Sequence, residues 1–224
     1  QMCIRDRANI LVSDDSSRSR EMANVLLTSM MKKLSEVDFI EKYCTAWLQQ
    51  SSNVLLKRCG FQVYKMLTTV FGMKVYPSLN KLALENISKI LADSKFNEEG
   101  NSVDWELVYS SLSVFGAIVS CLKDQIYEQK YISLWDSVID CLLYPHSWIR
   151  LITCRLVSVL LSNLDKSKLD NSKLELIATK LIHQLRTPSL SDELGTMCIK
   201  NLTFIAVKWE DTRAQLKTGD GDEM

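Results

Sequence analysis

Apolar residues recur every three or four positions along most of the chain, and residues 142–161 show this pattern most clearly. Pro145 lacks a backbone N–H and disfavours a helical Tyr144, so one helix should end near Leu143. A second helix follows, with an inward stripe of Ile149, Ile152, Leu156, Val159 and Leu160. Its other faces are predicted to carry Arg150, Thr153, Arg155 and Ser158. The stretch therefore predicts two antiparallel helices joined by a tight turn.

The same 3.6-residue pattern predicts about nine helices in all, and no segment alternates with the period of two that a strand requires. They are expected at about 19–34, 38–50, 54–71, 77–92, 104–122, 131–143, 147–161, 174–185 and 192–209. In the first of them the predicted inward stripe is Met22, Val25, Leu26, Met30 and Leu34. With three prolines and seven glycines in 224 residues, little interrupts these segments, so we expect an all-α fold.

Polar composition marks the two ends of the helical region. The first seven residues, QMCIRDR, resemble a translated sequencing adapter, and the cluster SDDSSRS follows them. The last residues, KTGDGDEM, are also polar. We therefore expect a disordered or artefactual segment over 1–18, a helical repeat domain over 19–209 and a disordered polar tail over 210–224.

The helical pattern also repeats along the chain. A shift of 93 residues places Leu56, Lys57, Cys59, Val63 and Leu67 on Ile149, Arg150, Ile152, Leu156 and Leu160. A further shift of 46 places Cys198, Leu202 and Ile205 on Ile152, Leu156 and Val159. Two units of 46 or 47 explain the shift of 93, and this period is typical of HEAT or armadillo-type repeats. The repetition predicts a HEAT/armadillo-like α-solenoid of about four to five stacked helix pairs, a fragment of a longer solenoid.

Charge and cysteine content narrow the function classes. Lys plus Arg and Asp plus Glu both total 27, so no whole-chain field draws the protein to nucleic acid or to an anionic membrane. No run of 18 or more apolar residues is present, and a membrane span is not expected. The seven cysteines form no CxxC motif, which favours reduced thiols that act as small hydrophobes over a metal or redox role.

Catalytic constellations are not found in the sequence. The two histidines, His146 and His183, are not part of an HExxH motif, and no phosphate-binding or nucleophile-elbow motif occurs. Glu98 and Glu99 lie in a predicted loop and read as solvated surface. Core packing is favoured over base stacking for Trp47, Trp105, Trp135, Trp148 and Trp209. We therefore expect neither an enzyme nor a cofactor, metal or small-molecule site.

Two segments carry a family resemblance. The first, LLYPHSWIRLITCRLVSVLL, combines a leucine-rich helix, a Tyr-Pro-His turn and Trp-Ile-Arg, and the second is Ala178–Phe204, ATKLIHQLRTPSLSDELGTMCIKNLTF. Both resemble the C-terminal region of the small-subunit processome component 20 family, also called the down-regulated-in-metastasis family. The similarity is strong over Leu134–Ile205 and weaker over Met22–Leu91. The sequence departs from the family pattern at Cys198 and in lacking a lysine-rich end.

The resemblance implies a non-enzymatic scaffold in ribosome biogenesis. Members of that family are long HEAT-repeat proteins of the nucleus and nucleolus that associate with the U3 small nucleolar ribonucleoprotein and are needed for 18S rRNA maturation. The expected partners are pre-ribosomal proteins and U3 components, with pre-rRNA reached through the assembly. The repeat pattern alone leaves an alternative open, a generic HEAT adaptor of the transport-receptor or phosphatase-regulatory type.

Three basic residues are candidates for RNA or protein contact, namely Lys57, Arg58 and Arg150. They recur at the start of second helices, where backbone N–H groups also favour phosphate. A HEAT consensus places Arg after the turn and an apolar residue, and in that repeat the Arg bonds within or between repeats. This structural role is therefore favoured for Arg150 over RNA binding.

Overall fold

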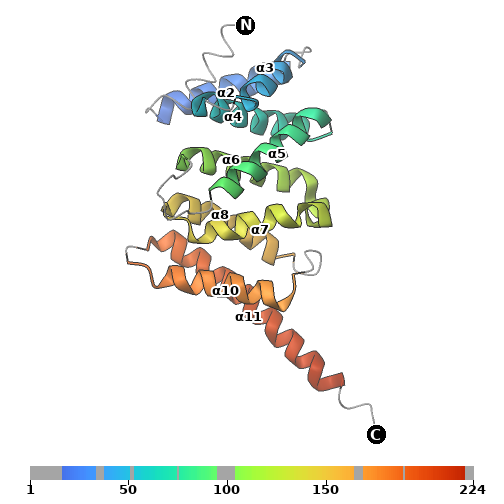
Figure 1. The fold of residues 1–224 in the computed structure, drawn as a ribbon, viewed down its shortest axis with the longest axis vertical. Coiled ribbons are helices and arrows are strands. Elements are labelled where there is room, and N and C mark those ends of the chain that lie inside the picture. The colour runs from blue at the N-terminus through green and yellow to red at the C-terminus, as the bar shows by residue number, and fades with distance from the viewer. Residues whose placement is uncertain are drawn as a thin grey trace. The chain divides into compact units, whose positions relative to one another are not determined.

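The computed structural model describes residues 17–33, 38–50, 53–74, 76–94, 104–163, 169–188 and 190–219. These residues form nine α-helices and three short 3-10 helices, with no strand among them (Figure 1), which confirms the predicted all-α fold and helix number. The predictions for residues 1–16, for Glu98 and Glu99, and for residues 220–224 lie outside this part of the chain. Two compact units are formed, Gln1–Ile126 and Tyr127–Met224.

Apart from the end of the last helix, the bounds of the helices follow the predicted ranges closely. The first unit contains α2 (Ser17–Lys33), α3 (Asp38–Leu48), α4 (Val54–Phe71), α5 (Pro77–Asp93) and α6 (Trp105–Leu122). The 3-10 helices are η1 (Lys123–Tyr127), η2 (Gln129–Tyr131) and η3 (Cys141–Leu143). The second unit contains α7 (Ile132–Asp140), α8 (Ser147–Leu161), α10 (Asn171–Leu185) and α11 (Asp192–Gly219).

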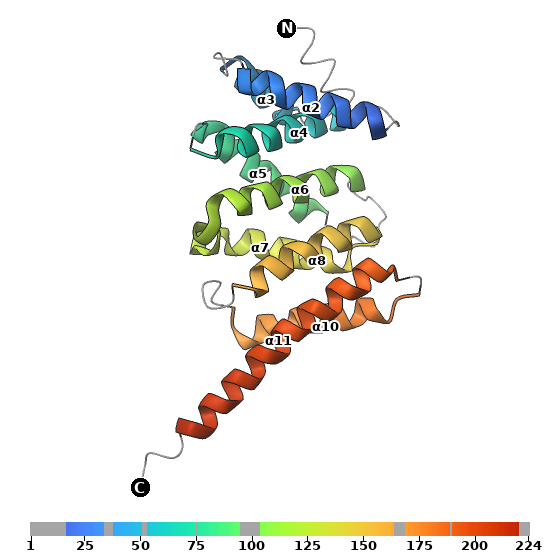
Figure 2. The ribbon, with the colours of Figure 1, turned by 180° about the vertical axis from the view of Figure 1, so that it is seen from behind.

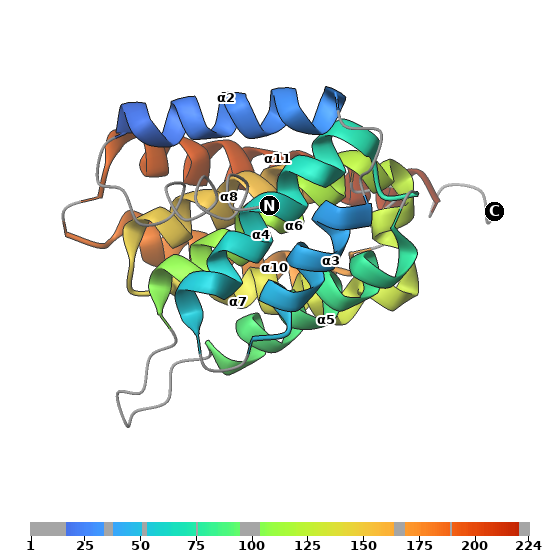
Figure 3. The ribbon, with the colours of Figure 1, turned by 90° about the horizontal axis from the view of Figure 1, so that it is seen from above.

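The first unit is built from two helix pairs and one further helix. Helix α3 packs against α4 and α5 against α6, while α3–α5 and α4–α6 contacts join the pairs. Gly60 of α4 allows the close approach of α3, since a Cβ there would lie 3.1 Å from atoms of Leu48. Helix α2 contacts α4 and runs at an angle to it (Figure 3). Tyr64, Phe61 and Phe115 are the largest fully buried side chains of this core.

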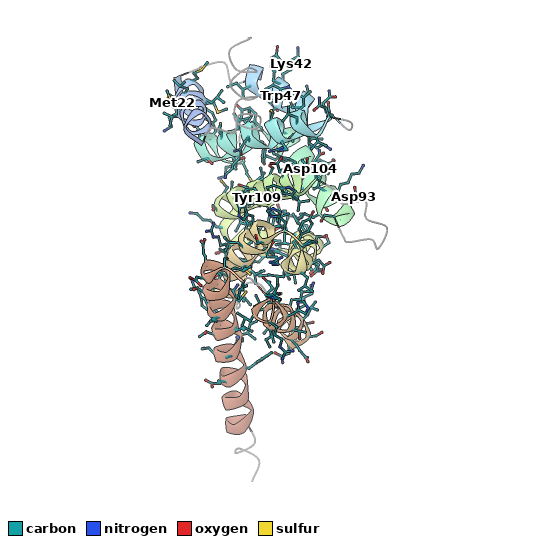
Figure 4. All side chains as sticks on the ribbon, turned by 90° about the vertical axis from the view of Figure 1, so that its left-hand side faces the viewer. Met22, Lys42, Trp47, Asp93, Asp104 and Tyr109 are labelled. Atoms are coloured by element: carbon teal, nitrogen blue, oxygen red, sulfur yellow. The ribbon has the colours of Figure 1, made fainter. Side chains whose placement is uncertain are left out.

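Local sequence signals start these helices. The Asn53 side chain accepts a hydrogen bond of 3.0 Å from the Leu56 N–H, and Asp104 accepts one of 2.8 Å from the Glu106 N–H. Pro77 occupies the first turn of α5, where a missing N–H costs nothing. Asp93 and Asp104, at the end of α5 and the start of α6, lie on the same side of the unit (Figure 4).

Helix α6 is the apolar centre of the first unit. The segment Trp105–Tyr127 is long and apolar enough to cross a membrane by length and composition. The segment was not expected to span a membrane from the sequence, because serines and a glycine divide it and leave no run of 18 apolar residues. Val108, Leu112 and Phe115 are fully buried, and both α4 and α5 pack against the helix. The core helix of a protein, covered by other helices on several sides, can have the same length and apolar composition as a membrane span.

The second unit repeats the pairing of antiparallel helices. Helix α7, continued by η3, contacts α8, while α10 packs against α11 and α8 also packs against α11. The predicted turn is confirmed, since η3 ends at Leu143, Tyr144 is extended and α8 begins at Ser147. His146 caps α8, with its Nδ1 accepting a hydrogen bond of 3.3 Å from the Trp148 N–H. The turn between the helices is thus determined by Pro145 and the capping residue.

The buried side of α8 is wider than the predicted stripe. Ile149, Leu156 and Leu160 are buried as expected, but Val159 is 40% exposed. Thr153 and Ser158, which were predicted on other faces, are buried. The reason is that α8 contacts both the α7–η3 segment and α11, so two sides of the helix are covered.

The inward stripe predicted for α2 is wrong. Met22, Val25 and Leu26 are exposed, whereas Leu27 and Met31 are buried. Met22 is seen on the surface of α2 in Figure 4. The helix carries apolar residues on more than one side, and its contact with α4 selects the side of Leu27 and Met31.

The last helix is longer than predicted. The pattern placed its end near Trp209, whereas α11 continues to Gly219 and runs well past the start of the antiparallel helix α10 (Figure 2). The expected boundary at residues 209 and 210 therefore falls inside α11.

Truncation of Leu156 tests the packing of α8. Its side chain is 5% exposed, so Leu156→Ala should lower the free energy of unfolding by about 2–5 kcal/mol through lost burial and cavity formation. Val159→Ala is the matched control on the same helix and should cost less than about 1 kcal/mol. Reversible urea denaturation measures both values. Equal losses for the two variants would contradict the burial assigned to α8.

Candidate interaction surfaces

The two candidate cations of the first unit lie on the first turns of α4. Arg58 forms an ion pair with Glu106 of α6, and its side chain is only 16% exposed. Partial burial, and then the nearby charge of Lys89, lower the pKa of Lys57, while Asp93 opposes this shift. Arg58 thus joins neighbouring helix pairs, and Lys57 faces charges on α5.

The third candidate, Arg150, holds the turn that precedes α8. Its Nη1 donates hydrogen bonds of 2.9 Å to the Tyr144 carbonyl and 2.6 Å to the Pro145 carbonyl. These carbonyls follow η3, so the guanidinium fixes the turn within one helix pair, as favoured from the sequence. Lys57 and Arg58 belong to the first unit and Arg150 to the second, and a shared role in RNA or protein binding stays a prediction.

Further ion pairs connect the successive helix pairs of the second unit. Lys173 and Lys180 of α10 lie 2.6 Å from Asp136 and 2.7 Å from Asp140 of α7, respectively. Arg155 of α8 pairs with Glu193 of α11. Acids on neighbouring helices therefore neutralise several cations of this unit, which accords with the zero net charge.

Large apolar side chains are exposed on several helices, among them α2 and α11. On α2 they are Met22, Val25 and Leu26, with exposed fractions of 57%, 60% and 43%. On α11 they are Ile199, Val207 and Trp209. The core assignment was wrong for Trp148 and Trp209, because their exposed fractions are 60% and 40%, whereas Trp47 and Trp135 are buried as predicted. Such surfaces suit contacts with other proteins.

A small cleft of about 190 Å³ opens in the second unit. It is lined by Tyr127, Ile132, Trp135, Asp136, Ile139, Leu160, Leu169, Asp170 and Lys173. The charged members are already engaged, since Lys173 pairs with Asp136 and the Asp170 carboxylate accepts a hydrogen bond of 2.8 Å from the Lys173 N–H. The sequence pattern did not indicate this cleft, because its residues come from η1, α7, α8 and the start of α10.

The thiols and histidines of the described residues form no cluster suited to a metal ion. Cys44, Cys59, Cys141, Cys154 and Cys198 are buried and Cys121 is exposed, and none of these six cysteines forms a disulfide. Burial raises the pKa of the Cys59 thiol to about 11. No group of three or more histidine, cysteine or acidic residues in these ranges is arranged to hold a metal. The five buried thiols thus pack as small apolar side chains in the core, as predicted, while their reduced state stays a prediction.

Comparison with known proteins identifies the class of this all-α chain. Residues 56–218 match the family model described as small subunit processome component 20 homolog, C-terminal. A relative from Saccharomyces cerevisiae, named U3 small nucleolar RNA-associated protein 20, is 36% identical over 209 residues, 92% of this chain. A Schizosaccharomyces pombe protein of the same name is 24% identical over 215 residues, 89% of this chain.

The chain therefore belongs to the small subunit processome component 20 family and corresponds to its C-terminal region. It spans 8% of the length of each of these two relatives. The family resemblance inferred from the two helical segments is thereby confirmed.

Substitution of Arg150 tests its role in the turn. Arg150→Ala should lower the free energy of unfolding by about 1–3 kcal/mol, because two carbonyls lose a charged donor. Arg155→Ala, which breaks an exposed pair on the same helix, should cost less than about 1 kcal/mol. Urea denaturation followed by circular dichroism compares them. A larger loss for Arg155→Ala would refute the assignment.

Proposed function

We propose that the chain is a non-enzymatic scaffold segment of the small-subunit processome and acts in ribosome biogenesis. The observation that carries the proposal is the family match over residues 56–218, together with relatives named for their association with U3 small nucleolar RNA. Within the nucleolus, the segment supports 18S rRNA maturation. Its partners on this proposal are pre-ribosomal proteins and U3 ribonucleoprotein components, with pre-rRNA reached through the assembly.

The helix arrangement within each unit supports a HEAT-like solenoid. In the first unit the second helices α4 and α6 contact each other, as do the first helices α3 and α5. In the second unit α8 contacts α11, and η3 contacts α10. Within each unit, the first helices of successive pairs thus contact each other, and so do the second helices. This is the arrangement of stacked helical repeats, in which each pair buries the face of its neighbour.

The surfaces support protein binding ahead of RNA binding. Arg58 is paired with Glu106, and Arg150 is bonded to two carbonyls. Met22, Val25 and Leu26, by contrast, present an exposed apolar face on α2. A scaffold held by protein contacts needs such faces, and it needs no excess of positive charge.

Association with U3 particles tests the proposed function. The tagged chain, expressed in eukaryotic cells, should enrich U3 small nucleolar RNA over other small RNAs after affinity capture. Met22→Glu with Val25→Glu should reduce this enrichment, because charge on the apolar face opposes protein packing. Ser78→Glu with Ala92→Glu adds the same charge at exposed sites of α5 and should leave it unchanged. Capture of transport cargo or phosphatase subunits without U3 RNA would favour the generic adaptor instead.

Direct RNA binding by the isolated chain should be weak and shallow in its salt dependence. With zero net charge the chain releases few counterions on binding, so U3 RNA and unrelated RNA should bind alike. Any residual binding should fall in a variant with Lys57, Arg58 and Arg150 changed to Gln. Lys42, Lys81 and Lys200, all exposed, changed to Gln provide a control of equal charge. Fluorescence titration at several salt concentrations measures these affinities, and tight binding that survives the first variant would rule out these contacts.

A further inference from the structure

Two buried thiols from different helix pairs meet in the second unit. The Sγ atoms of Cys154 on α8 and Cys198 on α11 lie 3.8 Å apart, which places the sulfurs in contact. Both side chains are 0% exposed. The two cysteines are 44 positions apart in sequence, close to the repeat period, so equivalent faces of successive second helices bring them together.

Polar groups surround this pair. The Gln184 Nε2 on α10 lies 3.8 Å from Cys154 Sγ, and the Asn201 Nδ2 donates a hydrogen bond of 2.9 Å to the Cys154 carbonyl. The hydrogen bond with Cys154, and then the charge of Arg150, lower the pKa of Cys198, against the effect of burial. The same hydrogen bond and burial raise the pKa of Cys154.

Other cysteines of the chain direct their thiols to backbone carbonyls instead. Cys44 donates to the Gly60 carbonyl at 3.2 Å, Cys121 to the Thr68 carbonyl at 3.5 Å and Cys141 to the Ser137 carbonyl at 3.4 Å. These three thiols satisfy a neighbouring acceptor, whereas Cys154 and Cys198 face each other. The contact between two sulfurs is what a disulfide requires before oxidation.

We propose that Cys154 and Cys198 form a dithiol that closes to a disulfide on oxidation by hydrogen peroxide and thereby links α8 to α11. One sulfur of the pair attacks one peroxide oxygen, the O–O bond breaks, and the departing hydroxide takes up the proton of that thiol as water. The other sulfur then attacks the sulfenic sulfur, the S–S bond forms, and the hydroxyl leaves with the proton of the second thiol as a second water. Two thiols and one peroxide thus give one disulfide and two waters.

The burial of the two thiols determines how fast they are oxidised and how the disulfide changes the stability of the second unit. Peroxide reaches the sulfurs when α11 separates briefly from α8, so oxidation is slow in the native chain and faster in mild denaturant. Once formed, the disulfide closes a loop of the chain and restricts the unfolded state, which stabilises the second unit. A thiol reductant reverses both changes. The inference is independent of the proposed scaffold function, since it rests on contacts within one unit.

Peptide mapping of the native chain tests the proposal. After exposure to hydrogen peroxide, free thiols are blocked by alkylation in denaturant, and the digest is examined by mass spectrometry without reduction. We expect a peptide pair joined through Cys154 and Cys198 that has lost two hydrogen atoms and that separates on reduction. Recovery of both cysteines as alkylated thiols, as sulfinic acids or as disulfides with other cysteines would overturn the proposal.

Thermal unfolding supplies the second measurement. Peroxide should raise the unfolding temperature of the parent chain, and reductant should restore it. The double variant Cys121→Ser with Cys141→Ser keeps the pair and should show the same upward shift. If Cys198→Ser folds, peroxide should not raise its unfolding temperature. If this variant does not fold, the peptide map of the parent chain tests the disulfide instead. A shift that persists in folded Cys198→Ser would refute the link between α8 and α11.

Discussion

The structure depends on the inability of an amphipathic helix pair to cover its own apolar side. In the second unit α8 meets this constraint with two partners, the α7–η3 segment on one side and α11 on another. In the first unit α4 contacts α2, α3 and α6. Each second helix is consequently buried over more than one stripe, and stability is shared between neighbouring pairs. Burial in this chain is a property of the interfaces between helices more than of any single helix.

Ion pairs also connect the helices at these interfaces, and in each pair the two charges neutralise each other. Arg58–Glu106 joins α4 to α6, Arg155–Glu193 joins α8 to α11, and Lys173–Asp136 joins α10 to α7. In each case the cation and the acid come from adjacent pairs, so the ion pairs disfavour slipped arrangements that would set like charges together. Arg58 and Arg150, at the start of second helices, therefore have structural partners, even in a family whose relatives are named for an RNA.

Periodicity predicted the helices well but not always the sides they bury. Pro145, Pro77 and the capping residues Asn53 and Asp104 act locally, so the helix ends near them were predictable from the sequence. The burial of Thr153 and the exposure of Met22 depend instead on which neighbour covers the helix. The contact of Cys154 with Cys198 was not predicted. The repeat shift of 46 residues aligned Cys198 with Ile152, whereas in the structure residues 44 apart face each other. A two-residue difference moves the facing side of a helix by more than half a turn.

A buried polar side chain explains why α8 and α11 pack with residues 44 apart in contact. Asn201 is fully buried on α11, and its amide reaches the backbone carbonyl of Cys154 on α8. A shift of α11 along α8 would leave that amide without its acceptor in an apolar surrounding, at a cost of about 1–3 kcal/mol. Apolar contacts between the same helices tolerate small shifts, since one methyl group can replace another. The amide therefore fixes the register of α11 on α8, and this register brings the two sulfur atoms into contact.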